Sequence, residues 1–272
     1  MRRVMLIVAV SCLAGMPARA QEKPAEPSPT GGLSEEQFKA LHQLTDKKAP
    51  EPKGKMIDLD GTRAYLSLPQ GKPPFPGVIV IHEWWGLNGH IQHWADRLAA
   101  DGYAALAVDL YGGQVAENRD DAMRFMKAVD GEKALGVLKR AHTFLKDDAS
   151  VKAEKRGCIG WCFGGGWSLR TAIAVPDLDA AVMYYGQPVL DLAELKKIRA
   201  PLLGIFANRD GSITPEQVDA FEKALASAGV KHKILRYDAD HAFANPSGAR
   251  YDEKAAAAAW AEARAFLAER LK

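Results

Sequence analysis

The sequence lacks an apolar run long enough to cross a membrane. The longest one near the start, residues 4–13, has about ten residues, whereas a transmembrane helix needs about 20. Arg2 and Arg3 precede this run, and Ala18-Arg19-Ala20 follows it as a small-x-small cleavage site. This pattern predicts a secretory signal peptide over residues 1–20, export to the periplasm and no stable membrane anchor. Cys12 offers a weaker, lipoprotein type of cleavage site, but the leucine usual in such sites is missing.

An excess of charge of one sign is also missing. The formal net charge is +2, and removal of residues 1–20 takes away three arginines and no acidic residue, which leaves a net charge of about −1. There is no basic tail or repeat, so nothing points to nucleic acid or an anionic membrane as a partner. We expect a small-molecule partner. The oligomeric state does not follow from the sequence, although a monomer is slightly favoured.

Cysteine is scarce, with three residues in 272. Cys158 and Cys162 are the two in the predicted mature chain, and an extended chain between them separates their Cα atoms by roughly 10 Å or more. A disulfide tolerates about 7 Å, so we expect two free thiols, and there is no Cys-x-x-Cys redox pair. An unpaired thiol in an oxidising compartment requires a reason, and catalysis is one.

Strand and helix patterns alternate over most of the chain. Residues 21–53 are predicted to be a flexible, proline-rich lead-in with a short surface helix near residues 34–44, and residues 54–272 to be one domain. This domain starts with a hairpin across Asp60-Gly61. Apolar strands then alternate with helices near residues 91–99, 119–129, 131–147, 163–175, 215–228 and 249–271. The pattern predicts an α/β fold with a mostly parallel sheet, an antiparallel N-terminal hairpin and helices on both faces.

Four reactive side chains each follow a predicted strand. These are Glu83, Cys162, Asp210 and His241. Because the carboxyl ends of parallel strands meet at one edge of the sheet, we expect these side chains to converge there.

The stretch Gly160-Trp161-Cys162-Phe163-Gly164 has the spacing of a nucleophile elbow, with cysteine in place of serine. The two glycines avoid Cβ clashes at the sharp strand-to-helix turn, and the helix N-terminus favours a thiolate at Cys162. The alternative interpretation is a glycine-rich turn that holds a buried structural cysteine.

The chain order of nucleophile, acid and base is Cys162, Asp210 and His241, as in α/β-hydrolase triads. His241 is the predicted general base, and Asp210 orients its ring. Asp238 and Asp240 are closer in sequence, but such triads take the acid from the preceding strand. The backbone N–H groups of Phe163 and Trp84 are the predicted oxyanion hole.

Over residues 55–271 the chain resembles the dienelactone hydrolase family of the α/β-hydrolase superfamily. The resemblance rests on residues 82–87 (HEWWGL), 109–111 (DLY) and 160–165 (GWCFGG), on Asp210 and on residues 240–243 (DHAF). It implies a cysteine-dependent carboxymethylenebutenolidase-like enzyme that cleaves an ester or lactone through a thioester, with no cofactor or metal. It also implies that Glu83 holds the resting cysteine and helps to ionise it.

The residues expected to contact substrate depart from the family pattern. Arg119 matches one of two arginines that anchor a substrate carboxylate, but the position of the other holds Asn245, which cannot form a bidentate charged pair. Met123 and Met126 stand where the family has aromatic residues, and Trp85 is a further candidate. A neutral ester is therefore as plausible as an anionic one.

Three other functions are alternatives to ester or lactone hydrolysis. His90 and His93 lie three apart near His82, but there is no His-Glu-x-x-His motif for a metal hydrolase. A non-catalytic, exported binding domain on a hydrolase scaffold is the main alternative. In a thiol redox protein, Cys158 would be badly placed to resolve Cys162.

Overall fold

The structure is a computed structural model that describes residue 30 and residues 32–272. The predicted signal peptide, the cleavage site and Cys12 lie outside the described residues. No helix in the described part of the chain is both long and apolar enough to span a bilayer.

The described residues form one mixed sheet of eight strands, in the order β1-β2-β4-β3-β5-β6-β7-β8. Pairings of β1 with β2 and of β2 with β4 are antiparallel, and the remaining neighbours are parallel. The strands are β1 (Lys55–Leu59), β2 (Thr62–Ser67), β3 (Gly77–Ile81), β4 (Ala104–Val108), β5 (Arg156–Trp161), β6 (Ala180–Tyr184), β7 (Leu202–Ala207) and β8 (His232–Tyr237). The predicted α/β-hydrolase fold is confirmed.

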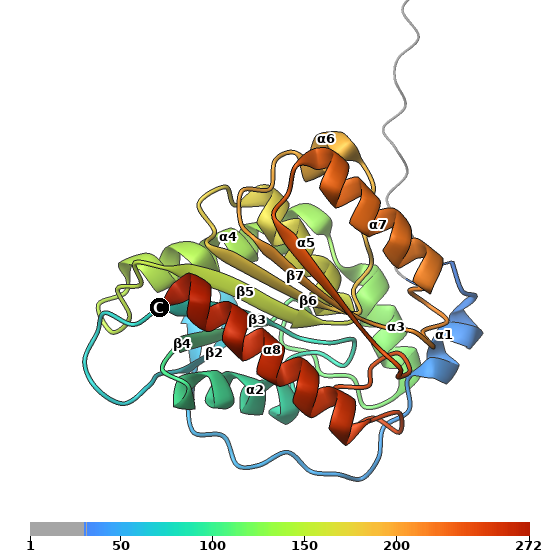
Figure 1. The fold of residues 1–272 in the computed structure, drawn as a ribbon. Coiled ribbons are helices and arrows are strands. Elements are labelled where there is room, and N and C mark those ends of the chain that lie inside the picture. Colours follow the sequence, from blue (N-terminus) through green and yellow to red (C-terminus); the bar gives the residue numbers. More distant parts are fainter. Residues whose placement is uncertain (1–29, 31) are drawn as a thin grey trace, which may run out of the picture.

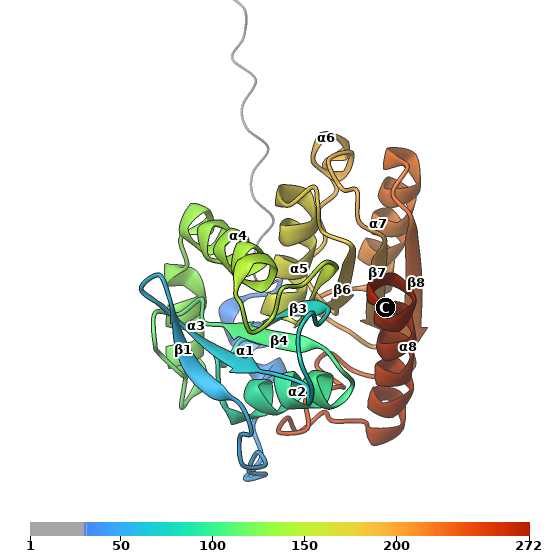
Figure 2. The same ribbon diagram turned by 90° about the vertical axis from the view of Figure 1, so that its left-hand side faces the viewer.

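Helices cover both faces of this sheet (Figures 1 and 2). One apolar core contains residues of α2 and α8, and the other contains residues of α4, α5 and α7. The helices are α1 (Glu35–Leu41), α2 (Gly89–Ala100), α3 (Arg119–Ala128), α4 (Gly131–Asp147), α5 (Phe163–Ala174), α6 (Leu192–Leu195), α7 (Pro215–Ala228) and α8 (Glu253–Leu271). The central strands β3, β4, β5, β6 and β7 are buried along their whole length, as a sheet covered on both faces requires.

The predicted hairpin forms at Asp60-Gly61. Both residues have positive φ, 50° and 79°, and the Gly61 N–H donates to Asp58 Oδ1 at 2.9 Å. A two-residue turn with two positive φ angles matches the twist of the flanking strands. The local turn chemistry thus sets the antiparallel start of the sheet.

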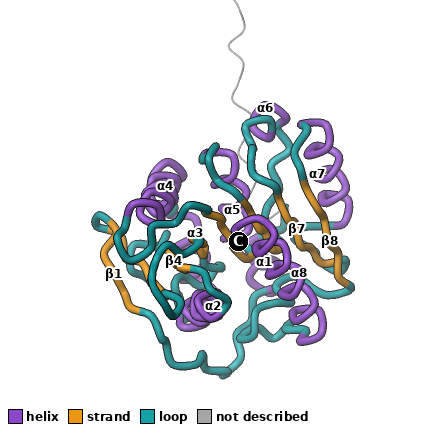
Figure 3. Tube along the Cα trace, turned by 60° about the vertical axis from the view of Figure 1, so that its left-hand side comes forward, coloured by secondary structure: helices purple, strands orange, loops and turns teal. Residues whose placement is uncertain are grey.

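The lead-in packs against the domain from α1 onward, where the sequence suggested a flexible segment. Ser34 and Gln37 form a capping box at the start of α1, which ends at Leu41, three residues earlier than expected. Leu44 then forms a bridge with Gly248, and the segment that follows α1 passes around α2 before β1 begins (Figures 1 and 3). His42, directly after α1, therefore lies at the edge of the sheet where the parallel strands β3 to β8 end, and the rest of the segment leads to the opposite edge, where β1 begins.

Candidate active site

Cys162 occupies the sharp turn between β5 and α5. Its backbone has φ 52° and ψ −115°, and its N–H donates to the Tyr184 carbonyl oxygen at 3.0 Å. A Cβ atom at Gly160 would overlap the Gly164 backbone, and one at Gly164 would overlap the carbonyl groups that end β3. Only glycine lets these segments approach so closely, so the elbow glycines have the role that the sequence predicted for them.

His241 and Asp210 reach Cys162 from the loops after β8 and β7. His241 Nε2 lies 3.3 Å from Cys162 Sγ, and His241 Nδ1 lies 2.6 Å from Asp210 Oδ2. The other Asp210 oxygen accepts the Ser212 and Ile213 N–H groups at 2.7 and 2.9 Å. Asp210 is thus fixed on both oxygens, and the three predicted triad residues form one connected chain.

The charges around His241 favour its protonated form. Burial opposes this, but the charges of Asp210 and Cys162 together with hydrogen bonds to both raise the pKa of His241 well above its usual value. An imidazole whose pKa is raised in this way takes a thiol proton readily. The arrangement can therefore hold a thiolate next to an imidazolium.

The two rival acids do not contact His241 as the acid of a triad would. Arg209 pairs with Asp238 at 2.7 Å and with Asp240 at 3.6 Å; Asp238 is exposed and Asp240 is partly exposed. The choice of Asp210 over its sequence neighbours therefore agrees with the geometry.

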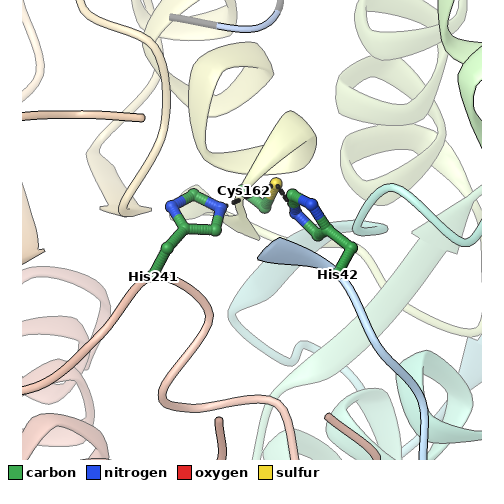
Figure 4. Close-up of side chains that lie close together, drawn as sticks. All are labelled: His42, Cys162 and His241. Carbon is green, nitrogen blue, oxygen red and sulfur yellow. Dashed lines mark hydrogen bonds between the residues drawn. The ribbon is translucent and has the colours of Figure 1, made fainter. Parts of the chain in front are cut away.

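An unexpected second histidine lies against the sulfur. His42, the residue after α1, places Nε2 3.5 Å from Cys162 Sγ and Nδ1 2.8 Å from the Phe38 carbonyl oxygen. Figure 4 shows the rings of His42 and His241 on opposite sides of the Cys162 side chain. Burial and the nearby charge of His241 lower the pKa of His42 to about 3, so His42 is a neutral imidazole.

Aromatic rings close the site from the lead-in side. The Phe38 ring meets Trp84 edge-on at 5.3 Å between centroids, and the His42 ring lies 4.4 Å from Trp84. Phe38 and His42 are buried, and Cys162 is only 7% exposed. A surface cleft of about 430 Å³ lies elsewhere, lined by Thr62, Asp109 and Lys133 among others and by none of the candidate site residues. The lead-in thus covers the nucleophile.

Glu83 has different partners from those that the family resemblance implied. Its carboxylate accepts Asn245 Nδ2 at 2.6 Å and Tyr185 Oη at 3.4 Å, while the thiol faces the two histidines. Burial raises the pKa of Glu83 to about 7, against the opposing effects of the His241 charge and the Tyr185 hydrogen bond. His42 Nε2 lies against the sulfur at 3.5 Å, and the role of Glu83 in ionising the cysteine stays a prediction.

The predicted oxyanion-hole residues are brought together by strand pairing. Phe163 is the first residue of α5, where helix N–H groups have no partner within the helix. Trp84 lies three residues after Ile81, which pairs with Gly160 across β3 and β5. Their role as donors stays a prediction.

The substrate-contact candidates fall into three groups. Arg119 is exposed and its Nη1 donates to the Lys39 carbonyl oxygen at 3.4 Å, so it contacts the lead-in. Met123, Met126 and Trp85 are buried in the core that also contains Cys162. Asn245 donates to Glu83 and also accepts the Ser247 N–H at 2.9 Å, and its contact with substrate stays a prediction.

Cys158 is separate from this chemistry. Both cysteines are free, and Cys158 Sγ lies 3.6 Å from the Ser168 carbonyl oxygen. Burial raises the pKa of Cys158 to about 12, so its thiol stays protonated. Cys158 is a packing residue.

Sequence reasoning missed two residues of the site. Tyr185 directly follows β6, and the same strand-end rule that identified Glu83 would have found it. His42 has no such signal, because it lies in a segment that resembles a polar linker.

Comparison with known proteins agrees with this geometry. The sequence model described as the dienelactone hydrolase family matches residues 62–271. A protein of Aquifex aeolicus, provisionally named carboxymethylenebutenolidase, is 32% identical over 233 residues, which cover 80% of this chain and all of that one.

Two solved structures are similar in fold and sequence. One is a provisionally named dienelactone hydrolase from Klebsiella pneumoniae (28% identity, TM-score 0.70, 76% of this chain and 93% of that one). The other is P91, a dienelactone hydrolase-like promiscuous phosphotriesterase from metagenomic libraries (27% identity, TM-score 0.70, 83% of this chain and all of that one).

Proposed function

The chain belongs to the dienelactone hydrolase family, and from this premise we propose that it hydrolyses an ester or lactone through a thioester on Cys162. Membership of this family supports a hydrolase that acts on small esters or lactones. The observation that carries the cysteine mechanism is the connected chain Cys162 Sγ, His241 and Asp210, with steps of 3.3 and 2.6 Å.

The first half of the reaction acylates the sulfur. His241 Nε2 takes the Cys162 proton, and the thiolate attacks the substrate carbonyl carbon. The tetrahedral intermediate collapses, the C–O bond to the leaving alcohol breaks, and His241 returns the proton to that alcohol. Asp210 keeps Nδ1–H directed at its carboxylate and stabilises the imidazolium.

The second half hydrolyses the thioester. His241 takes a proton from water, and the hydroxide attacks the acyl carbon. The tetrahedral intermediate collapses, the C–S bond breaks and the acid is released, and His241 returns the proton to the sulfur to regenerate the thiol. The N–H groups of Phe163 and Trp84 are the proposed donors to the oxyanion in both halves. Removal of one such donor typically costs about 10²–10³ in turnover.

Substrate has to displace the lead-in before it reaches the sulfur, because His42 and Phe38 occupy the approach to Cys162. Asn245, bound to Glu83, stands at the position of the second family arginine, so Arg119 lacks the arginine that would complete the family's carboxylate clamp. We therefore propose a neutral ester or lactone as the substrate.

The test is hydrolysis of p-nitrophenyl acetate combined with alkylation. Iodoacetamide is expected to inactivate the enzyme with one label per chain at Cys162, as located by peptide mass spectrometry. His241→Ala is expected to lower turnover by about 10³ or more, and Cys158→Ala is the matched control with turnover near wild type. Full activity after complete alkylation of Cys162 would end the cysteine mechanism, and a His241→Ala loss below tenfold would mean that another base acts.

The substrate panel compares neutral esters and lactones with anionic ones, and includes a phosphotriester because P91 is described as a phosphotriesterase. Faster turnover of an anionic lactone than of its neutral counterpart would contradict the proposed preference. If none of these compounds is hydrolysed, the non-catalytic binding domain is favoured.

Export is part of the proposal. Arg2, Arg3, the short apolar run and Ala18-Arg19-Ala20 support a signal peptide that ends at residue 20. The protein recovered from a periplasmic fraction should begin at Gln21 by intact mass. A retained N-terminus in the cytoplasm would refute it.

A further inference from the structure

We propose that Cys162, His241 and His42 form a binding site for Zn²⁺, and that the bound ion reversibly inhibits the enzyme. The ligand atoms of these three residues all lie within 4.8 Å of one another. They come from three distant parts of the sequence: the lead-in, the elbow and the loop after β8 (Figure 4). Binding of the ion does not depend on the proposed function; only its inhibitory effect does.

The two sulfur–nitrogen distances suit tetrahedral zinc. Zn–S and Zn–N bonds of about 2.3 and 2.0–2.1 Å at a tetrahedral angle place sulfur about 3.5 Å from each nitrogen. The observed separations from Cys162 Sγ are 3.3 Å to His241 Nε2 and 3.5 Å to His42 Nε2. The two Nε2 atoms lie within 4.8 Å of each other, and a tetrahedral ion requires about 3.3 Å between them, so metal binding is expected to draw the two rings together over the sulfur.

Both imidazoles are already oriented as metal ligands. His241 Nδ1 contacts Asp210 at 2.6 Å, and His42 Nδ1 contacts the Phe38 carbonyl oxygen at 2.8 Å. Each acceptor holds a proton on Nδ1, so that loss of the Nε2 proton of His241 on metal binding leaves both Nε2 lone pairs available to an ion beside the sulfur. Carboxylate and carbonyl partners of this kind are the usual support of zinc-bound histidines.

Charge also balances in the buried site. Zinc binding releases to solvent the one proton shared by Cys162 Sγ and His241 Nε2, and the two imidazoles bind as neutral donors. The thiolate and Asp210 together carry two negative charges, which the ion neutralises. A buried cluster with no net charge avoids the cost of an uncompensated charge.

Inhibition follows from the same contacts. The zinc-bound sulfur and His241 Nε2 are the atoms that the proposed mechanism needs for attack and proton transfer. Coordination by His42 also fastens the lead-in over the elbow, which keeps substrate out. In an oxidising compartment the bound thiolate would at the same time be shielded from oxidation.

Metal binding is measured on reduced, metal-free protein with Zn²⁺ against a chromogenic chelator, and with Co²⁺ as a spectroscopic probe. One Zn²⁺ should bind per chain, and Co²⁺ should give a sulfur-to-cobalt charge-transfer band. His42→Ala and His42→Gln should each weaken Zn²⁺ binding at least about tenfold, since loss of even an outer partner costs 10–100-fold. Cys162→Ser should abolish the cobalt band.

The matched control is His93→Ala, which removes a partly exposed histidine of α2 that is not one of the three ligands. It should bind Zn²⁺ like the wild type. Unchanged affinity in both His42 variants, equal weakening in His93→Ala, or the absence of a charge-transfer band in folded wild-type protein would overturn the site. Circular dichroism of each variant separates lost binding from lost folding.

Activity supplies the second readout. Saturating Zn²⁺ should lower the rate of p-nitrophenyl acetate hydrolysis at least about tenfold, and a chelator should restore it. A rate that rises or stays unchanged with the site occupied would overturn the inhibitory role. A chain that binds Zn²⁺ as expected but hydrolyses nothing without it would instead count against the proposed function and leave the site intact.

Discussion

Cys162 is the residue at which backbone strain and reactivity coincide. A non-glycine residue at φ 52° costs about 1–3 kcal/mol, and such strain persists only where the surrounding structure enforces it. Here the hydrogen bond from the Cys162 N–H to the Tyr184 carbonyl oxygen and the close backbone contacts of Gly160 and Gly164 hold this conformation. The turn places the sulfur at the N-terminus of α5, beside both histidines.

Glu83 is a buried residue whose environment opposes the charged form of its carboxyl group. Burial raises its pKa from 4.5 to about 7, so between these pH values the folded state binds a proton that the unfolded state does not. The stability that this proton gives is present at low pH and is lost as the pH rises through 7. The shift corresponds to about 3 kcal/mol, with His241 and Tyr185 as the titratable groups that face the carboxyl.

Glu83→Gln should therefore change the pH dependence of stability. The free energy of unfolding of the variant, relative to wild type, should rise by up to about 3 kcal/mol between pH 4.5 and pH 8. Urea unfolding at several pH values measures this difference. Glu36→Gln, at an exposed position of α1, is the control and should run parallel to wild type. A parallel curve for Glu83→Gln would mean that Glu83 is charged throughout this range.

Among the elements, the strand ends could be predicted and the lead-in could not. Buried β-branched runs and an Asp-Gly turn are local signals, so the sheet, its hairpin and the positions of Cys162, Asp210 and His241 followed from the sequence. The contact between His42 and Cys162 spans 120 residues, and no local pattern encodes it. The same applies to the Asn245–Glu83 bond across 162 residues.

Helix α1 depends on a few buried contacts. It has seven residues, too few to be stable in isolation. Its ion pairs, such as Lys39 with Asp120 at 2.7 Å, involve exposed carboxylates and contribute little. The Phe38 ring and the buried His42 are therefore the main attachment of α1 itself.

At the scale of the whole molecule, the sheet has a core on each face that consists mainly of residues from β1 onward. The described part of the lead-in contributes Phe38 and Leu33 to one core and no residue to the other. Lys53 and Gly54, by contrast, bind Asp96 and Tyr65 through their backbone N–H groups. The cooperative unit of the fold is thus expected to begin near Lys53.

A chain that starts at Lys53 should fold and should expose its nucleophile. We expect the truncated chain to have the circular dichroism spectrum of the mature chain and one cooperative thermal transition. Its Tm should be lower by no more than about 10 °C, because a buried Phe side chain contributes about 1.5–3 kcal/mol and each kcal/mol shifts Tm by about 2–4 °C at this size. Alkylation of Cys162 by iodoacetamide should become at least about tenfold faster than in the chain from Gln21, since His42 and Phe38 no longer cover the sulfur. If the truncated chain is unfolded, the lead-in is part of the core. If the truncated chain is folded but its alkylation rate is unchanged, the lead-in does not control access to Cys162.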